Sequence, residues 1–244
     1  MEIKMGGILK STWEMLHDGR FLKKALMIAC PVALQGMLNT IVNMVDTLMI
    51  GGLGSTAIAA VGLANKVFFV FSLLVFGIVS GGGILAAQFW GSGDVKNIRK
   101  VLGLCVMLAM VGAMFFVVPA LTAPRMVMRI FTTSEGSIEL GAKYLRIAAL
   151  SYPFIALTNV YVAMLRATNK VVFPVICSCI AIVVNICLNY VLIFGKFGAP
   201  TMGVAGAACA TLTARCIEVT LVLFYVYGKK TASCLRTEGN VWLA

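Results

Sequence analysis

The sequence is poor in charged residues and nearly devoid of histidine. Asp, Glu, Lys and Arg make up only 12% of the 244 residues, whereas soluble globular domains carry about 25%. So little charge cannot cover a surface that faces water, which excludes a soluble protein. The single histidine, His17, precedes the first apolar run. The cluster of histidines and acids that a membrane-embedded enzyme would need is therefore missing, and we expect no enzymatic activity.

Hydrophobic residues, in contrast, make up 61% of the chain. They gather into runs long enough to cross a bilayer core of about 30 Å, which requires roughly 20 helical residues. The runs cover residues 25–50, 57–88, 101–122, 144–165, 171–194 and 203–227. The sequence therefore predicts an all-α, polytopic membrane protein of the cell membrane, with a bundle of six transmembrane helices over residues 25–227.

The positive charges predict the orientation of this bundle. The net charge of +11 comes from Lys and Arg residues that lie between the apolar runs rather than in one stripe, which argues against nucleic-acid binding. When successive loops are assigned to alternate sides, 13 of these residues, Arg166 among them, fall on the side of both termini and 5 on the other. Because positive charge marks the cytoplasmic side, the N-terminal segment 1–24 and the tail 228–244 are both expected to be cytoplasmic.

The first apolar run carries a polar stripe. Gln35, Asn39, Asn43 and Asp46 are spaced by 4, 4 and 3 residues, which places them on one helical face. Such a stripe is expected to face protein or a water-filled cavity rather than lipid, although the amides could simply join helices through hydrogen bonds. A lone carboxyl in the membrane is by default a proton or cation site. Asp46 is therefore expected to bind H⁺, or Na⁺ with amide oxygens as further ligands, and no other metal or cofactor is expected.

The fifth and sixth runs also carry polar faces. These consist of Ser178, Asn185 and Asn189 in the fifth run and of Thr211, Arg215 and Glu218 in the sixth. Counted from the outer loops, Asn185, Asn189 and Thr211 lie at a depth similar to that of Asp46. These four side chains can form one cation site if the first, fifth and sixth helices adjoin, but the sequence does not establish that adjacency.

Other polar residues of the apolar runs have two interpretations. Arg215 and Glu218, one helical turn apart, either neutralise each other or line a substrate path. Asn159 in the fourth run is a weaker candidate for the same path. Pro31 removes a backbone hydrogen bond from the first helix, which can therefore bend at that point.

Four stretches of the chain carry a family resemblance. They are Asn185 to Gly195 with its continuation through 197–200 and 203–211, Pro31 followed by 44–54, residues 81–94, and the pair Leu165-Arg166. Together they resemble the multidrug and toxic compound extrusion (MATE) family. The first stretch is similar to the fifth helix, the extracellular turn and the start of the sixth helix of that family.

The resemblance implies an antiporter that exports organic, often cationic, drugs or toxic metabolites against an inward flow of Na⁺ or H⁺. In similar members an aspartate at the position of Asp46 handles the coupling cation. Positions matching Asn185, Asn189 and Thr211 complete that site in some members, and some members carry an acid where this chain has Asn189. The proline that matches Pro31 is a proposed bending point.

The chain departs from the family in length. Members have about twelve helices in two similar lobes, and this sequence resembles the first lobe only. A second lobe or a second copy of the chain is therefore expected to complete the transporter, unless the chain is an inactive truncated fragment. A lipid-linked saccharide flippase of the same superfamily is the alternative function. It would need several cationic groups around the cavity, for which the sequence offers only Arg215 and Lys66.

Overall fold

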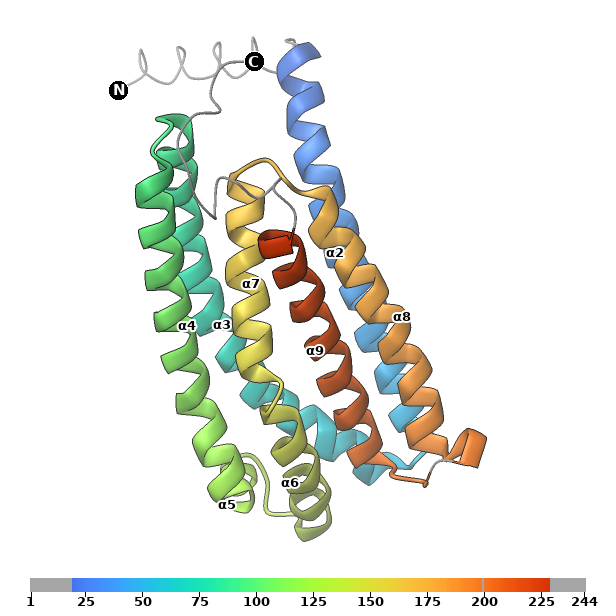
Figure 1. The fold of residues 1–244 in the computed structure, drawn as a ribbon. Coiled ribbons are helices and arrows are strands. Elements are labelled where there is room, and N and C mark those ends of the chain that lie inside the picture. Colours follow the sequence, from blue (N-terminus) through green and yellow to red (C-terminus); the bar gives the residue numbers. More distant parts are fainter. Residues whose placement is uncertain (1–18, 199, 229–244) are drawn as a thin grey trace, which may run out of the picture.

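The computed structural model describes residues 19–198 and 200–228, and this part of the chain is a bundle of helices without a strand. Six helices run along the bundle and three shorter ones join them at one end (Figure 1). The long helices are α2 (Gly19–Gly51), α3 (Ser55–Gly91), α4 (Val95–Thr122), α7 (Tyr152–Ala167), α8 (Val172–Phe194) and α9 (Val204–Gly228). The short helices are α5 (Pro124–Arg129), α6 (Glu135–Ala149) and η1 (Lys196–Gly198).

The apolar character of these helices confirms a polytopic membrane protein. Four of the described helices, α3, α4, α8 and α9, are long and apolar enough to cross a membrane, and the bent pair α6–α7 can form a fifth span. Helix α2 contains the first predicted run, 25–50, and begins six residues earlier, at Gly19. The count of six spans and the cytoplasmic position of both termini stay predictions, and segments 1–24 and 228–244 fall largely outside the described residues.

The fourth predicted run, 144–165, is not one straight helix. Helices α6 and α7 meet at Leu150 and Ser151 with a bend of 46°. Pro153 lies in the first turn of α7, where its missing N–H and fixed φ are tolerated but where a continuous helix would lose a hydrogen bond. The hydroxyl of Ser151 donates to the carbonyl of Ala148 at 2.6 Å, which satisfies one of the last carbonyls of α6. Because the residues on both sides of the break are apolar, the hydrophobic pattern of the sequence does not indicate it.

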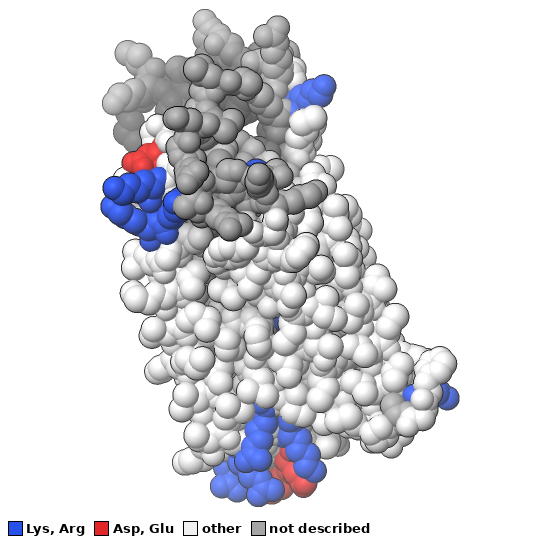
Figure 2. All heavy atoms as spheres, viewed as in Figure 1, with Lys and Arg blue, Asp and Glu red and all other residues white. Residues whose placement is uncertain are grey.

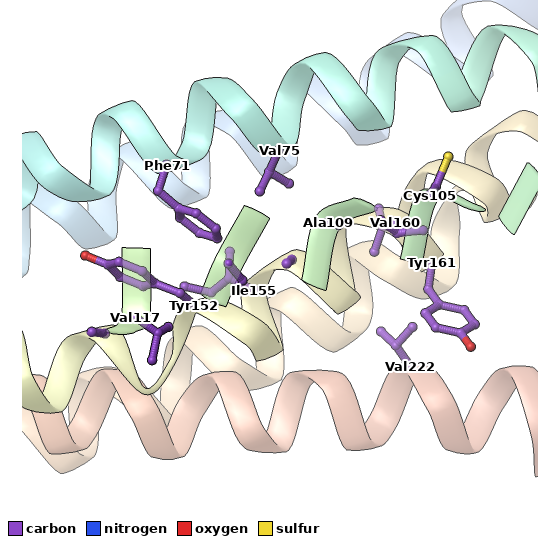
Figure 3. Packing of buried hydrophobic residues seen from close by; sticks show 14 of the residues in the cluster. Phe71, Val75, Cys105, Ala109, Val117, Tyr152, Ile155, Val160, Tyr161 and Val222 are labelled. Atoms are coloured by element: carbon purple, nitrogen blue, oxygen red, sulfur yellow. The ribbon is translucent and has the colours of Figure 1, made fainter. Parts of the chain in front are cut away.

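The helices pack in two groups that share α6 and α7. Helix α9 packs against α8, α6 and α7, while α3 packs against α4, α6 and α7, and α2 contacts α8 and α3. The apolar core lies mainly between α3, α4 and α7 (Figure 3), where the rings of Phe71 and Tyr152 stack at 4.6 Å between centroids. Helices α8 and α9 approach so closely that a Cβ atom on Gly206 would lie 2.7 Å from the carbonyl oxygen of Leu192.

Charged side chains of the described residues gather near the two ends of the bundle. Figure 2 shows them at the top and bottom of one face, with a long band of uncharged side chains between them. Such a band suits the hydrocarbon core of a bilayer, and Lys and Arg suit its borders. The few charged side chains inside the bundle are therefore candidates for a functional site.

Candidate functional site in the helix bundle

A cavity of about 710 Å³ lies among α2, α3, α6, α7, α8 and α9. Its volume is within the range of pockets that hold drug-sized molecules. The lining includes most of the residues that the sequence singled out, namely Gln35, Asn43, Asp46, Asn159, Asn185, Thr211, Arg215 and Glu218. Asn189 is fully buried behind this wall, and the side chain of Asn39 lies outside the described part of the structure.

The first polar group of the cavity, the Asp46 cluster, consists of Asp46, Asn185, Asn189 and Thr211. The amide of Asn189 donates to the Asp46 carboxylate at 2.6 Å and to the side-chain oxygen of Asn185 at 3.1 Å. Asn185 in turn donates to the Thr211 hydroxyl at 3.4 Å. Helices α2, α8 and α9 therefore adjoin at this depth, so the structure brings together the four residues whose adjacency the sequence left open.

One oxygen of the Asp46 cluster is unpaired. Asn189 is fully buried, yet its side-chain oxygen accepts no hydrogen bond from any described residue. Buried polar atoms are rarely left without a partner, because each costs roughly 1–3 kcal/mol. The carboxylate, the two amide oxygens and the hydroxyl of this cluster are the hard oxygen ligands that small cations prefer. The cluster therefore has the donor set of a small cation site.

The second polar group, the Glu218 chain, consists of Arg166, Gln35, Ser178, Glu218 and Arg215. The buried Glu218 carboxylate accepts from the Ser178 hydroxyl at 2.7 Å and from the Arg215 guanidinium at 2.7 Å. The Gln35 amide donates to the Ser178 oxygen at 2.6 Å, and its own oxygen accepts from Arg166. The chain ties together α2, α7, α8 and α9.

The Glu218 chain extends the predicted set of residues. Arg215 and Glu218 form the ion pair that their spacing suggests, and both also line the cavity, while their part in a substrate path stays a prediction. The distribution of positive charge predicts Arg166 in a cytoplasmic loop, but it lies in the last turn of α7 and lines the cavity. The family resemblance of the pair Leu165-Arg166 is the sequence signal that points to Arg166 as a functional residue. The sequence places Ser178 on a polar face but does not predict it as a site residue.

Pro31 and Lys66 take positions outside the two hydrogen-bonded groups. Pro31 lies inside α2, which continues as helix from Gly19 to Gly51 through it. Lys66 is exposed on α3 and does not belong to the cavity lining. Among the described residues, the cationic groups that line the cavity are Arg166 and Arg215, and the acids are Asp46 and Glu218.

Comparisons with known proteins agree on one family. The MatE family model matches residues 31–191. The probable multidrug resistance protein NorM of Thermotoga maritima is 31% identical over 210 residues, which cover 85% of this chain and 45% of that protein. The probable multidrug resistance protein YoeA of Bacillus subtilis is 30% identical over 82% of this chain and 43% of that protein.

Solved structures share the fold. An outward-facing multidrug resistance MATE family transporter of the MOP superfamily superposes with a TM-score of 0.76 at 23% identity, over 84% of this chain and 45% of that one. An inward-facing structure of such a transporter gives a TM-score of 0.72, also at 23% identity, over 85% of this chain and 46% of that one.

The chain spans about half the length of the curated relatives that it matches, and it corresponds to their N-terminal lobe. Those relatives are multi-pass proteins of the cell membrane, and the apolar helices of this bundle agree with that location. The chain therefore belongs to the MatE family, a family of membrane transporters rather than enzymes.

Proposed function

We propose that the chain is the N-terminal lobe of a cation-coupled antiporter that exports organic, often cationic, drugs or toxic metabolites. The observation that carries this proposal is the Asp46 carboxylate on the wall of a drug-sized cavity, held by Asn189, whose second polar atom is buried and unpaired. An acid in this position attracts either a coupling ion or a positively charged substrate. If the coupling ion and the substrate occupy the Asp46 carboxylate in turn, the inward movement of the ion is coupled to the outward movement of the substrate.

Both Na⁺ and H⁺ suit Asp46, and the cluster favours Na⁺. A proton needs only the carboxylate, whereas Na⁺ needs several oxygen ligands. The oxygens of Asn185, Asn189 and Thr211 can supply them beside Asp46. A bound Na⁺ would also give the buried Asn189 oxygen the partner that the described residues do not provide. No cofactor is needed for such exchange.

Opening and closing of the cavity is proposed to use Pro31. Because proline has no N–H, the carbonyl of Met27, one turn earlier, loses its intrahelical partner. Gln35, one turn later, is held to α7 and α8 through Arg166 and Ser178. The part of α2 before Pro31 can therefore tilt while the part after it stays fixed.

A second wall for the cavity is proposed to come from a second lobe in the bilayer, either as further protein or as a second copy of this chain. Mass measurement of the detergent-solubilised chain, combined with transport in vesicles, separates these cases. A dimer that transports supports a working pair of lobes. A monomer that does not transport identifies an inactive fragment, and the proposed function then applies only to a longer protein.

The flippase alternative is not supported. A carrier of lipid-linked saccharides would need a cavity with excess positive charge, whereas the charged lining residues here are two arginines and two acids. One of the arginines, Arg215, is moreover paired with Glu218.

The proposal is tested by Asp46→Asn in vesicles with an imposed Na⁺ or pH gradient and the fluorescent cation ethidium. Wild-type protein is expected to move ethidium in the direction opposite to the flow of Na⁺ or H⁺ down the imposed gradient. The variant is expected to lose this movement while inserting normally. Glu139→Gln is the matched control, because Glu139 is an exposed acid paired with Lys143 and does not line the cavity. Full ethidium transport by the Asp46 variant would refute the role of Asp46.

A further inference from the structure

The charged side chains of the cavity are unequally neutralised. Among the described residues they are Asp46, Glu218, Arg166 and Arg215. Arg215 is bonded to Glu218 at 2.7 Å and also lies within electrostatic reach of Asp46. Within the described ranges, Arg166, in contrast, has only the neutral amide oxygen of Gln35 as a hydrogen-bond acceptor. The two arginines therefore differ in kind, although they face the same cavity.

No carboxylate of the described chain is available to Arg166, because each one is bonded elsewhere. These contacts are Asp46 with Asn189, Asp94 with Asn97, Glu135 with Arg129, Glu139 with Lys143, and Glu218 with Arg215 and Ser178. A partly buried guanidinium without an anionic partner is costly in a membrane. An anion that enters the cavity would remove this cost.

The guanidinium of Arg166 is also held ready for such an anion. Gln35 accepts one of its five N–H groups, and Gln35 is itself fixed by its bond to Ser178 at 2.6 Å. The remaining donors form a planar fork that matches the two oxygens of a carboxylate. Because the side chain is already anchored, little conformational entropy remains to be lost when a ligand binds.

Arg166 and Asp46 stand toward opposite ends of the cavity. Gln35, which contacts Arg166, and Asp46 lie on the same helix about 11 residues apart, which corresponds to a rise of about 16 Å. The acid at one end would hold the positive group of a substrate, and the guanidinium at the other end would hold a negative group. The two ends of the cavity are thus complementary to a molecule that carries both charges.

We propose that Arg166, positioned by Gln35, forms an anion subsite that binds the carboxylate of zwitterionic organic substrates. This inference rests on the proposed function, since it assumes that the cavity takes organic substrates. A purely structural role is the competing explanation, because a cation in the last turn of α7 also stabilises the end of that helix. That role needs a positive charge but has no preference for one ligand over another.

The experiment uses the full chain, purified in an uncharged detergent, and two probes that share one fluorophore. Rhodamine B is a zwitterion at neutral pH, and rhodamine B ethyl ester is the corresponding cation without a free carboxylate. Fluorescence anisotropy gives Kd for each probe. Wild-type protein is expected to bind rhodamine B roughly tenfold more tightly than the ester.

Arg166→Gln is expected to bind both probes with the affinity that the wild-type chain has for the ester. Arg166→Lys keeps the charge at the end of α7 but loses the planar fork, and is expected to retain only part of the preference. Size-exclusion chromatography in detergent verifies folding, and if the Gln variant aggregates, the Lys variant decides. If Arg166→Lys kept the full wild-type preference for rhodamine B over the ester, recognition by the planar guanidinium would be overturned.

The remaining outcomes separate this inference from the proposed function. Equal affinity of the wild-type chain for both probes, or an unchanged preference in Arg166→Gln, overturns the subsite and leaves the proposed function standing, because both probes bind. An equal loss of affinity for both probes shows a structural role and also overturns the subsite. A wild-type chain that binds neither probe contradicts the subsite and the proposed function together.

Discussion

The Asp46 cluster and the Glu218 chain line the same cavity with similar residue types, but they differ in how fully their polar atoms are paired. In the Glu218 chain the buried carboxylate accepts two hydrogen bonds, and Ser178 and Gln35 each donate one and accept one. In the Asp46 cluster the buried oxygen of Asn189 has no partner among the described residues. The paired part of the Glu218 chain, from Gln35 to Glu218, fixes helices, whereas the unpaired oxygen of Asn189 indicates a place for a ligand.

This difference separates the stability of the bundle from its response to a cation. Damage to the Glu218 chain should loosen the bundle, because the chain joins four helices. Damage to the Asp46 cluster should remove the response to a cation while changing the fold less. The variants below test that separation, beginning with the largest expected effect.

Glu218→Ala is expected to lower the free energy of unfolding by about 2–3 kcal/mol, because it leaves the half-buried Arg215 without its hydrogen-bonded acid. Chemical unfolding in detergent measures the change. The double variant Arg215→Met, Glu218→Leu removes both charges and is expected to unfold within about 1 kcal/mol of the wild type. If the single and double variants were equally unstable, the buried charge would not be the cause.

Gly206→Ala is expected to cost about 1–3 kcal/mol, because the added Cβ atom would lie 2.7 Å from the Leu192 carbonyl oxygen and push α9 away from α8. The Asn185–Thr211 hydrogen bond, at 3.4 Å, spans this helix pair and should break first. Gly62→Ala is the matched control, since nothing lies within 4 Å of its added Cβ atom. Melting curves of both variants make the comparison, and equal curves would argue against close packing at Gly206.

Ser178→Ala and Asn189→Ala compare the two groups directly. The Ser178 variant removes a partner from Glu218 and Gln35 and is expected to lose about 1–3 kcal/mol of stability, while Na⁺ still raises its melting temperature relative to choline at constant pH. The Asn189 variant is expected to lose the Na⁺ effect. A wild-type chain without any Na⁺ effect, combined with transport driven by a pH gradient, would instead identify H⁺ as the coupling ion.

The exposed pair Arg129–Glu135 should have the smallest effect. Its atoms are 3.2 Å apart, but the two side chains are 61% and 74% exposed. Such pairs contribute about 1 kcal/mol or less, because water screens them. Replacing both residues by alanine is therefore expected to leave the melting temperature and ethidium transport nearly unchanged. A large loss of either would show that the end of the bundle formed by α5 and α6 contributes more than its contacts indicate.

The sequence predicted the helices and their polar faces because hydrophobic runs and helical spacing are local properties. It placed Asp46, Asn185, Asn189 and Thr211 at one depth, but depth along separate helices does not say which helices touch. That adjacency depends on contacts such as the close approach at Gly206, which arise only when the bundle packs.

Two further features escaped the sequence for physical reasons. The break between α6 and α7 lies within a continuously apolar segment, where Pro153 was the only local sign. Arg166 was assigned to a loop because basic residues usually mark the ends of membrane helices. Its contact with Gln35, 131 positions away in the chain, could not be foreseen from spacing along one helix.

The hydrogen bonds from Arg166 to Glu218 all point in one direction. Arg166 donates to Gln35, Gln35 donates to Ser178, and Ser178 donates to Glu218. An ionised carboxylate can only accept, so it fixes the hydroxyl of Ser178, which fixes the amide of Gln35, which presents its oxygen to Arg166. The direction of hydrogen bonding that the Glu218 carboxylate sets on α9 thus extends through two neutral side chains to Arg166 on α7. A neutral donor in place of the Glu218 carboxylate would reverse the bonds of Ser178 and Gln35 and leave Arg166, which can only donate, without its acceptor.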